Sequence, residues 1–266
     1  MRTKIRFLVY PLVVAVLSTF LIVGCSDDED EVLPDDPTPG KIYDIDGNEY
    51  KTVRIGNQEW MAENLRVTKY ANGDAIPTGL SDNERQNTTS GAYAIYPHGS
   101  IEGLNSDEEV VAAYGKLYNW YAVDDTSGLC PEGWSVPSDY DWTQLIDYLV
   151  DQGFPNSNVA GGAGNALKYC LQVDSPVEGC NTSEHPRWDS DNTHFGFDEF
   201  GFSALPSGTR WLDGSFFFVG SSGYWWSATE FGGTPAWSRY MSRFIGDVYR
   251  LNYGKRNGFS VRCIRD

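Results

Sequence analysis

The alternation of apolar and polar residues predicts short strands near both ends of the chain. Residues 41–65 contain apolar runs separated by Asp46-Gly47 and Gly56-Asn57, which are typical hairpin turns. After residue 201 the strand pattern returns, with Gly, Ser, Asp and Asn between the runs. The strands expected there cover residues 202–205, 216–219, 224–228, 237–241, 248–251 and 259–264.

Two adjacent tryptophans, Trp225 and Trp226, are the clearest feature of this second strand region. Neighbouring side chains of a strand point to opposite faces, so we expect one large ring on each face of the sheet. Residues 259–264 also alternate, with Phe259, Val261 and Cys263 against polar neighbours. We expect this last strand to place its cysteine in the core.

The middle of the chain predicts helices. The strongest signal begins at Ser138, a good N-cap with Asp141 three residues later, and Gly153 supplies the stop. Residues 106–123 predict a helix that Gly115 interrupts, residues 164–169 a shorter helical piece, and residues 93–96 a short strand. Strands first, helices in the middle and strands last predict one α+β domain over residues 41–266. The apolar stripe of the strongest helix consists of Trp142, Leu145, Ile146 and Leu149.

The first 25 residues have the pattern of an export signal. Residues 1–6 are basic, residues 7–23 form an apolar run that is short for a membrane span, and Gly24 precedes Cys25. This pattern resembles a bacterial lipoprotein box, in which cleavage precedes the cysteine and its thiol is acylated. The resemblance implies that residues 1–25 are a lipoprotein signal peptide and that Cys25 carries a lipid anchor in the membrane. The alternative is a signal peptide with an incidental cysteine.

Residues 26–40 predict an acidic, proline-rich tether. Residues 26–31 are almost entirely acidic, and residues 34–40 contain three prolines, which is typical of an extended linker. An acidic run directly after a lipidated cysteine also resembles the signal by which Bacteroidetes-type bacteria place lipoproteins on the outer face of the outer membrane. This resemblance implies an outer-membrane protein that faces outside.

Charge and composition exclude some classes of protein. The chain has 37 Asp and Glu against 20 Lys and Arg, a formal net charge of −17. Such a surface repels nucleic acid, and no basic stripe offsets it, so we expect no nucleic-acid partner. A 14% aromatic content with 28 glycines favours a loop-rich fold with many short strands over a helical bundle.

The remaining four cysteines indicate disulfides. Cys130, Cys170, Cys180 and Cys263 lie in the predicted domain, and an even number in an exported chain implies two bonds. The sequence leaves three connectivities open.

Six motifs, in order along the predicted domain, resemble the Fibrobacter succinogenes major paralogous domain family. That family is a largely uncharacterised group of secreted and surface proteins, so the resemblance implies little about activity. The order of parts also resembles a C-type-lectin-like fold of the formylglycine-generating-enzyme kind. This second resemblance implies that Cys130 pairs with Cys263 and that Cys170 pairs with Cys180. The family motifs occupy residues 48–65, 114–121, 130–137, 201–208, 224–228 and 258–263.

Catalytic motifs are missing from the sequence. His98, His185 and His194 stand in no recognisable acid–base or metal motif, and no Gly-x-Ser-x-Gly motif is present. Formylglycine-generating enzymes use free cysteines, whereas lipid and disulfides account for those of this chain. We therefore expect a non-catalytic domain without a cofactor, apart from a candidate calcium ion.

Two acidic stretches have some features of calcium sites. Asp44, Asp46 and Asn48 have the spacing of a calcium loop, but Gly47 comes too early and Ile55 stands where a glutamate is needed, so a turn is expected. The stretch between residues 188 and 200 is rich in oxygen ligands of the kind calcium prefers, and its alternative is an acidic surface loop. Its candidate ligands are Asp189, Asp191, Asn192, Asp198 and Glu199.

Aromatic residues with polar neighbours suggest a binding role. Exposed Trp and Tyr rings stack on the apolar faces of sugars, while polar side chains satisfy the hydroxyls. For each ring the alternative is packing in the core. The leading hypothesis is a surface-anchored lipoprotein whose domain binds an extracellular glycan or protein. The other hypotheses are a structural or assembly component of the cell surface and a secreted enzyme. The candidate contacts are Trp188, Arg210, Trp211, Tyr224 and Trp237.

Overall fold

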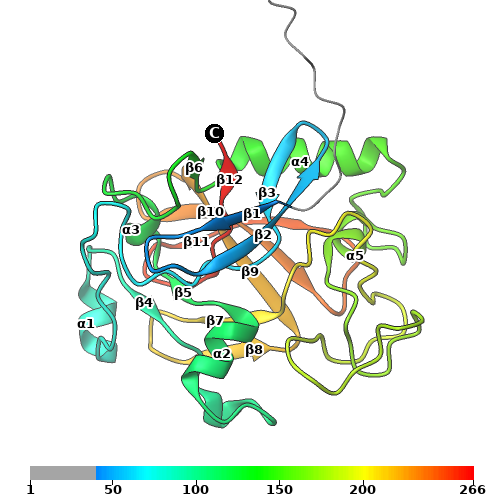
Figure 1. The fold of residues 1–266 in the computed structure, drawn as a ribbon, viewed down its shortest axis with the longest axis horizontal. Helices are drawn as coiled ribbons and strands as arrows, with labels where there is room; N and C mark the ends of the chain where they lie inside the picture. Colours follow the sequence, from blue (N-terminus) through cyan, green and yellow to red (C-terminus); the bar gives the residue numbers. More distant parts are fainter. Residues whose placement is uncertain (1–39) are drawn as a thin grey trace, which may run out of the picture. The chain divides into compact units, whose positions relative to one another are not determined.

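The computed structural model describes residues 40–266 (Figure 1). The predicted signal peptide, Cys25 and residues 26–39 of the predicted tether lie outside the described residues. The described part contains two five-stranded sheets and one two-stranded sheet, with short helices between the strand-rich ends. It is therefore a β-rich α+β fold, with mainly antiparallel strands.

The first five-stranded sheet has the order β1-β2-β3-β12-β6. Its first three strands are the hairpin series expected for residues 41–65. The turn before β2 is organised by Asp44, whose Oδ1 accepts hydrogen bonds from the backbone N–H of Asp46 (3.0 Å) and of Asn48 (2.9 Å), as expected for a turn. The strands are β1 (Lys41–Tyr43), β2 (Glu49–Ile55), β3 (Gln58–Met61), β12 (Ile264–Arg265) and β6 (Trp134–Ser135).

The second five-stranded sheet has the order β11-β10-β9-β7-β8. In its antiparallel part, Tyr240 lies opposite both Tyr224 and Tyr249. The strand predicted for 202–205 is wrong: only Ala204 forms an isolated bridge, and the strand follows at 207–210 instead. The strands are β7 (Ser207–Arg210), β8 (Phe216–Val219), β9 (Ser222–Glu230), β10 (Pro235–Ser242) and β11 (Tyr249–Gly254). The two-stranded sheet pairs β4 (Tyr93–Ala94) with β5 (Leu117–Tyr118).

The longest helix in the described range begins and ends as expected. Ser138 caps α4, its Oγ accepting from the backbone N–H of Asp141 (3.2 Å), while the Asp141 carboxylate accepts from the backbone N–H of Ser138 (2.7 Å). The helix predicted for 106–123 is split, because Gly115 adopts a φ of +78° and ends α2 there. The helices are α1 (Asp82–Asn87), α2 (Asp107–Tyr114), α3 (Trp120–Val123), α4 (Asp139–Asp151), α5 (Ala163–Leu167) and the 3-10 turn η1 (His98–Ser100).

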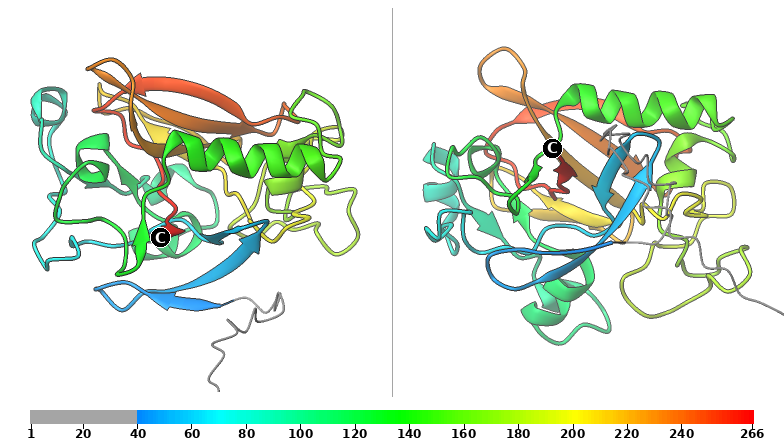
Figure 2. Two further views of the ribbon diagram at one scale, coloured as in Figure 1. Left: turned by 90° about the horizontal axis from the view of Figure 1, so that it is seen from above. Right: turned by 45° about the horizontal axis from the view of Figure 1, so that its top comes forward.

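Helix α4 lies between the two large sheets (Figure 2). Trp142 on this helix packs against Trp60 of β3 at a ring distance of 4.9 Å, in the same cluster as Trp225 of β9. Trp226 belongs to a second cluster on the other face of β9, with Phe259 at 4.3 Å. Trp225 and Trp226 are both fully buried, one on each face of β9, which confirms the prediction. Burial of each ring stabilises the fold by roughly 2–3 kcal/mol.

The last segment differs from the single strand that was expected. Phe259 and Ser260 form isolated bridges with Tyr118 and Trp225, and only Ile264–Arg265 is a strand, inserted between β3 and β6. The polar positions Ser260 and Arg262 are fully buried, because the segment runs between elements that cover both of its sides. Two disulfides, Cys130–Cys263 and Cys170–Cys180, join the pairs that the fold resemblance implied.

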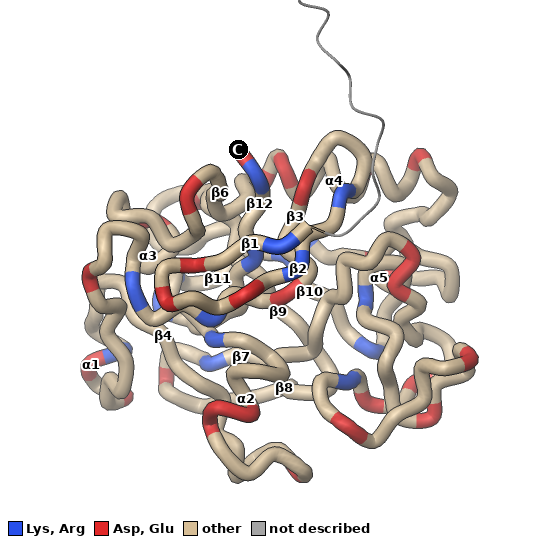
Figure 3. The backbone as a smooth tube through the Cα atoms, in the orientation of Figure 1, with Lys and Arg blue, Asp and Glu red and all other residues tan. Residues whose placement is uncertain are grey.

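Charged residues are distributed unevenly between core and surface. Many acidic positions lie on peripheral loops and helix ends, whereas several basic positions lie toward the middle of the view (Figure 3). Among the described residues, Asp44 is the one buried acid, against six buried bases. The buried bases are Arg85, Lys116, Lys168, Arg210, Arg239 and Arg262.

Candidate functional site

Aromatic side chains gather on the face of the second sheet that points away from α4. Trp225 and Arg239 point toward α4, so their strand neighbours Tyr224 and Tyr240 point to the opposite face. β11 contributes further rings in register with β10, and the residue after β7 adds one more. We call this set the aromatic surface, and it consists of Trp211, Tyr224, Tyr240, Tyr249 and Tyr253.

The rings of the aromatic surface form a continuous series of contacts. Tyr224 lies 4.8 Å from Tyr240, which stacks on Tyr249 at 6.0 Å with 5° between the ring planes. Trp211 lies 5.4 Å from Tyr253 and 6.5 Å from Tyr224. Tyr224 is 5% exposed and forms the base of the series, whereas Tyr249 is 41% exposed and the other three are half-buried. The surface therefore passes from the core to the solvent.

The phenol groups of Tyr224 and Tyr253 stay neutral at ordinary pH. Burial, followed by the neighbouring tyrosines, raises the pKa of Tyr224 above its usual value, and burial and Tyr240 raise that of Tyr253. A neutral phenol both donates and accepts hydrogen bonds. The surface thus combines ring faces with uncharged polar groups.

Two of the five predicted contacts, Trp211 and Tyr224, belong to the aromatic surface. Arg210 precedes Trp211 on the chain, but its guanidinium lies over the Phe216 ring (5.2 Å) and pairs with Asp82 (3.2 Å), so its side chain points away from this surface. Trp188 corrects the prediction, because it is 1% exposed and its Nε1–H donates to the carbonyl of Ala204 (3.0 Å) in the core. Trp237 lies on the opposite face of β10, and so outside this surface.

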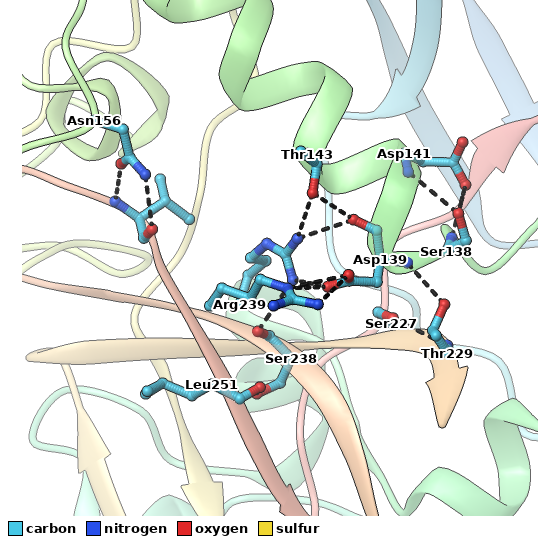
Figure 4. A network of polar contacts seen from close by, with 12 residues as sticks. Ser138, Asp139, Asp141, Thr143, Asn156, Ser227, Thr229, Ser238, Arg239 and Leu251 are labelled. Atoms are coloured by element: carbon cyan, nitrogen blue, oxygen red, sulfur yellow. Dashed lines mark hydrogen bonds and ion pairs between the residues drawn. The ribbon is translucent and has the colours of Figure 1, made fainter. Parts of the chain in front are cut away.

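The surroundings of Trp237 serve to attach α4 to the second sheet. The Arg250 guanidinium lies 3.4 Å from the Trp237 ring centre, and both Arg239 and Arg250 donate to the Asp139 carboxylate at 2.7 Å (Figure 4). Burial raises the pKa of Asp139, but the hydrogen bonds from Arg250 and Arg239 outweigh it, so the pKa lies below its usual value. The charges of Arg239, Arg250 and Asp139 are paired with one another, and the Arg250 guanidinium covers the Trp237 ring. These four side chains therefore have a structural role.

Sequence analysis missed the tyrosines at 240, 249 and 253. Their proximity depends on the register of β10 with β9 and β11, which no local pattern specifies. The sequence does contain one indication of this surface: Tyr249, Leu251 and Tyr253 occupy every second position, which predicts that they share one apolar face of a strand.

A second concave feature is a groove with a volume of about 500 Å³, within the range of small-molecule sites. Asn64 lies at its buried side, where its Oδ1 accepts from Trp225 Nε1 (2.9 Å) and Arg262 Nε (3.1 Å) and its Nδ2 donates to the Tyr114 carbonyl (2.9 Å). The Glu63 carboxylate in the wall accepts from Arg66 (2.9 Å). Because the polar groups of Asn64, Glu63 and Arg66 already hydrogen-bond within the protein, they are not free to bind a ligand in the groove.

The calcium candidates do not converge. Asp191 accepts from the backbone N–H of Thr193 (2.8 Å), whereas Asp198 accepts from the Ser203 backbone (2.7 Å) and hydroxyl (2.6 Å). Within residues 40–266, no three His, Cys, Asp or Glu side chains are grouped as a metal ion requires. Asp189 and Glu199 belong to no such group, and the calcium site over Asp189, Asp191, Asn192, Asp198 and Glu199 stays a prediction.

Two of the three histidines, His98 and His185, connect loops to α2. His98 Nδ1 lies 2.7 Å from Asp107 Oδ1 at the start of α2. His185 Nδ1 lies 2.6 Å from the Tyr114 hydroxyl, and its Nε2 lies 2.9 Å from the Glu102 carbonyl. Burial lowers the pKa of His185. These contacts hold the 102 and 185 loops on α2.

No helix between residues 40 and 266 is long and apolar enough to cross a membrane. In comparisons with known proteins, residues 53–265 match a family model described as the Fibrobacter succinogenes major domain. No curated protein and no solved structure matches the chain. The matched range contains the whole aromatic surface, from Trp211 to Tyr253.

Proposed function

We propose a function from the premise that this chain belongs to the Fibrobacter succinogenes major domain family, whose model covers most of its length. Family membership alone assigns no activity, so the proposal rests on the site. The chain is a surface lipoprotein whose folded domain binds an extracellular glycan, without catalysing a reaction on it. The aromatic surface is the contact face for the sugar.

One observation carries this proposal: five aromatic rings, from β9, β10, β11 and the residue that follows β7, meet in one partly exposed surface. Sugar rings present apolar C–H faces that stack on aromatic side chains, and their hydroxyls pair with groups such as neutral phenols. Tyr249 has the most accessible ring, with 41% of its surface exposed, and it stacks on the half-buried ring of Tyr240. Tyr224 belongs to a buried core cluster and Tyr240 and Tyr253 pack against its edge, so the aromatic surface extends this cluster toward the solvent at Tyr249.

The sequence supplies the rest of the proposal. Residues 1–25 are a lipoprotein signal peptide, Cys25 carries the lipid anchor, and residues 26–40 hold the domain away from an outer membrane whose outer face it occupies. The order of strands and helices further supports a C-type-lectin-like fold, with Cys130–Cys263 connecting its middle to its end.

A glycan array probed with the full chain in detergent tests the proposal. We expect binding to at least one glycan, and Tyr249→Ala should weaken it about 5- to 30-fold, the loss of one stacked ring. Tyr140→Ala is the matched control, since Tyr140 is 68% exposed but lies on α4, away from the aromatic surface.

Two outcomes would replace the proposal with another. Ordered self-association without glycan binding would favour a structural or assembly component of the cell surface. Equal loss of binding in both tyrosine variants would place the contact elsewhere than on the aromatic surface.

A further inference from the structure

Lys116 is buried with most of its hydrogen-bonding capacity unused. The residue is 6% exposed, and its Nζ donates to the backbone carbonyl of Arg66. This carbonyl is the one acceptor of Nζ within residues 40–266, whereas an ammonium group carries three N–H donors. Lys168, which is also buried, shows full pairing in the same protein, because its Nζ donates to three backbone carbonyls. Two N–H donors of Lys116 therefore remain for another partner.

The end of α2 fixes the position of Lys116. Gly115 ends the helix with a φ of +78°, and a Cβ there would stand 2.7 Å from Asn64 Cβ, so a glycine lets the chain pass close to the 64–66 segment. The backbone N–H of Lys116 then donates to the Leu65 carbonyl (3.1 Å), and its Nζ donates to the next carbonyl along the chain. Lys116 belongs to the family motif at 114–121, to which the proposed function gives no role.

The ammonium of Lys116 has no carboxylate in contact with it among the described residues. Burial lowers its pKa, and the charges of Asp46 and Asp44 offset only part of this effect. A buried cation without a counter-ion carries an unfavourable solvation free energy, which an adjacent anion reduces. The environment of Lys116 therefore favours an anionic partner.

Lys116 lies in the wall of a pocket with a volume of about 380 Å³, between α2 and the segment that follows β3. This volume is within the range of small-molecule sites. The Arg66 carbonyl that accepts from Nζ and the Tyr93 ring 5.4 Å from Nζ both belong to residues of the same wall, so the ammonium borders the pocket. None of the lining residues belongs to the aromatic surface. The lining consists of Asn48, Arg66, Thr68, Tyr93, Ile95, Asp107, Glu108, Val111, Ala112 and Lys116.

The two ends of this pocket differ in charge. Lys116 and Tyr93 are buried and form its inner end, whereas Asp107 and Glu108 are exposed and lie toward the solvent. A ligand that fits therefore carries one anionic group at its inner end and an apolar body, and the two acids at the outer end repel polyanions. The apolar part of the lining that would contact this body consists of Ile95, Val111 and Ala112.

We infer that this pocket binds a small monocarboxylic acid with an apolar body, whose carboxylate accepts hydrogen bonds from Lys116 Nζ. Charge-assisted hydrogen bonds of this kind are roughly twice as strong as neutral ones. The body of the ligand packs against the wall of α2 and the Tyr93 ring, which removes apolar surface from water. The site is separate from the aromatic surface and does not depend on the proposed function.

Calorimetry on the full chain in detergent tests the site with phenylacetate, 3-methylbutanoate and hexanoate, each compared with its primary amide. The amide keeps the shape of the ligand and removes its charge. We expect at least one carboxylate to bind about 10-fold more tightly than its amide, the difference between a charge-assisted and a neutral hydrogen bond. Lys116→Met should remove this preference, because it keeps an apolar stem and loses the ammonium. Lys51→Met is the matched control and should keep the preference, since Lys51 is exposed and lines the larger groove instead of this pocket.

Several outcomes would overturn the inference. They are the absence of binding by all three carboxylates, equal binding of each carboxylate and its amide, and a preference that survives in Lys116→Met. If Lys116→Met does not fold, Val111→Trp narrows the pocket, leaves the ammonium in place and should prevent binding of the preferred carboxylate. NMR of the wild type with ¹³C-labelled lysine adds a direct measurement, in which the Cε signal of Lys116 should shift with the carboxylate and not with the amide. Binding that leaves this signal unchanged would place the carboxylate elsewhere and refute the site.

Discussion

Removing the two disulfides separately should give unequal losses of stability. Cys130–Cys263 spans 133 residues of sequence, and Cys170–Cys180 spans 10. A crosslink restricts the unfolded chain more when the loop is longer, and the chain-entropy model assigns about 5 kcal/mol to the first and about 3 kcal/mol to the second. The first value is comparable with the whole stability of many domains, which is about 5–15 kcal/mol.

Packing adds to this difference. Cys263 is fully buried and Cys130 is 6% exposed, so a Cys130→Ala/Cys263→Ala variant also loses core contacts, on the order of 1 kcal/mol. The Cys170→Ala/Cys180→Ala variant serves as the comparison, because it makes the same chemical change around the short loop. The long-loop variant should therefore unfold about 12–24 °C lower than the wild type, and the short-loop variant about 6–12 °C lower.

Urea unfolding followed by tryptophan fluorescence gives the free energies, since six tryptophans of the described region are almost fully buried. The denaturant slope should also rise in the long-loop variant, because its unfolded chain exposes more surface. Equal losses in the two variants, or a larger loss from the short loop, would refute the reasoning from loop length.

Three further predictions concern single side chains. Asp139→Asn should cost about 3–5 kcal/mol, because it leaves the buried Arg239 without its carboxylate, whereas Glu49→Gln at the exposed Lys41 pair should change stability little in urea unfolding. The folded-state pKa of Asp139 is depressed, so its contribution is fully present above the unfolded value near 4 and is lost as pH falls through the lower folded-state value. The difference in unfolding free energy between the wild type and Asp139→Asn should therefore be smaller at pH 3 than at pH 6. Gly223→Ala should cost about 1–3 kcal/mol, since its Cβ would stand 2.2 Å from the Trp225 ring, while Gly254→Ala meets nothing within 4 Å and is the control. Cys25→Ala should release the protein from membranes in cell fractionation, and unchanged fractionation would contradict the lipid anchor.

Local signals accounted for the elements that sequence analysis predicted well. Helix α4 carries its cap at Ser138 and its apolar stripe within one continuous segment, so residues 138–153 specify it alone. The Trp225-Trp226 pair likewise predicts that both faces of its strand are buried, because neighbouring side chains of a strand point to opposite faces of the sheet.

Features that depend on distant segments were not predictable in the same way. Ser260 and Arg262 look like the exposed side of a strand, and only the elements on both sides of that segment bury them. Trp188 resembled a ligand contact because it lies among acidic residues, yet pairing of its segment with residues 171–173 draws it into the core. The aromatic surface depends in the same way on the pairing of several strands, and brings together Trp211 and Tyr253, which are 42 positions apart in the sequence.

The position of β12 has a consequence for the order of events during folding. The β1–β3 hairpins are made first on the ribosome, but the sheet that contains them joins β6 only through Ile264 and Arg265. In a nascent chain that lacks Ile264 and Arg265, the edge of β3 opposite β2 has no strand to pair with, whatever time is allowed for folding. Completion of the domain therefore waits for some two hundred further residues to be translated, and such distant pairing is expected to make maturation slow.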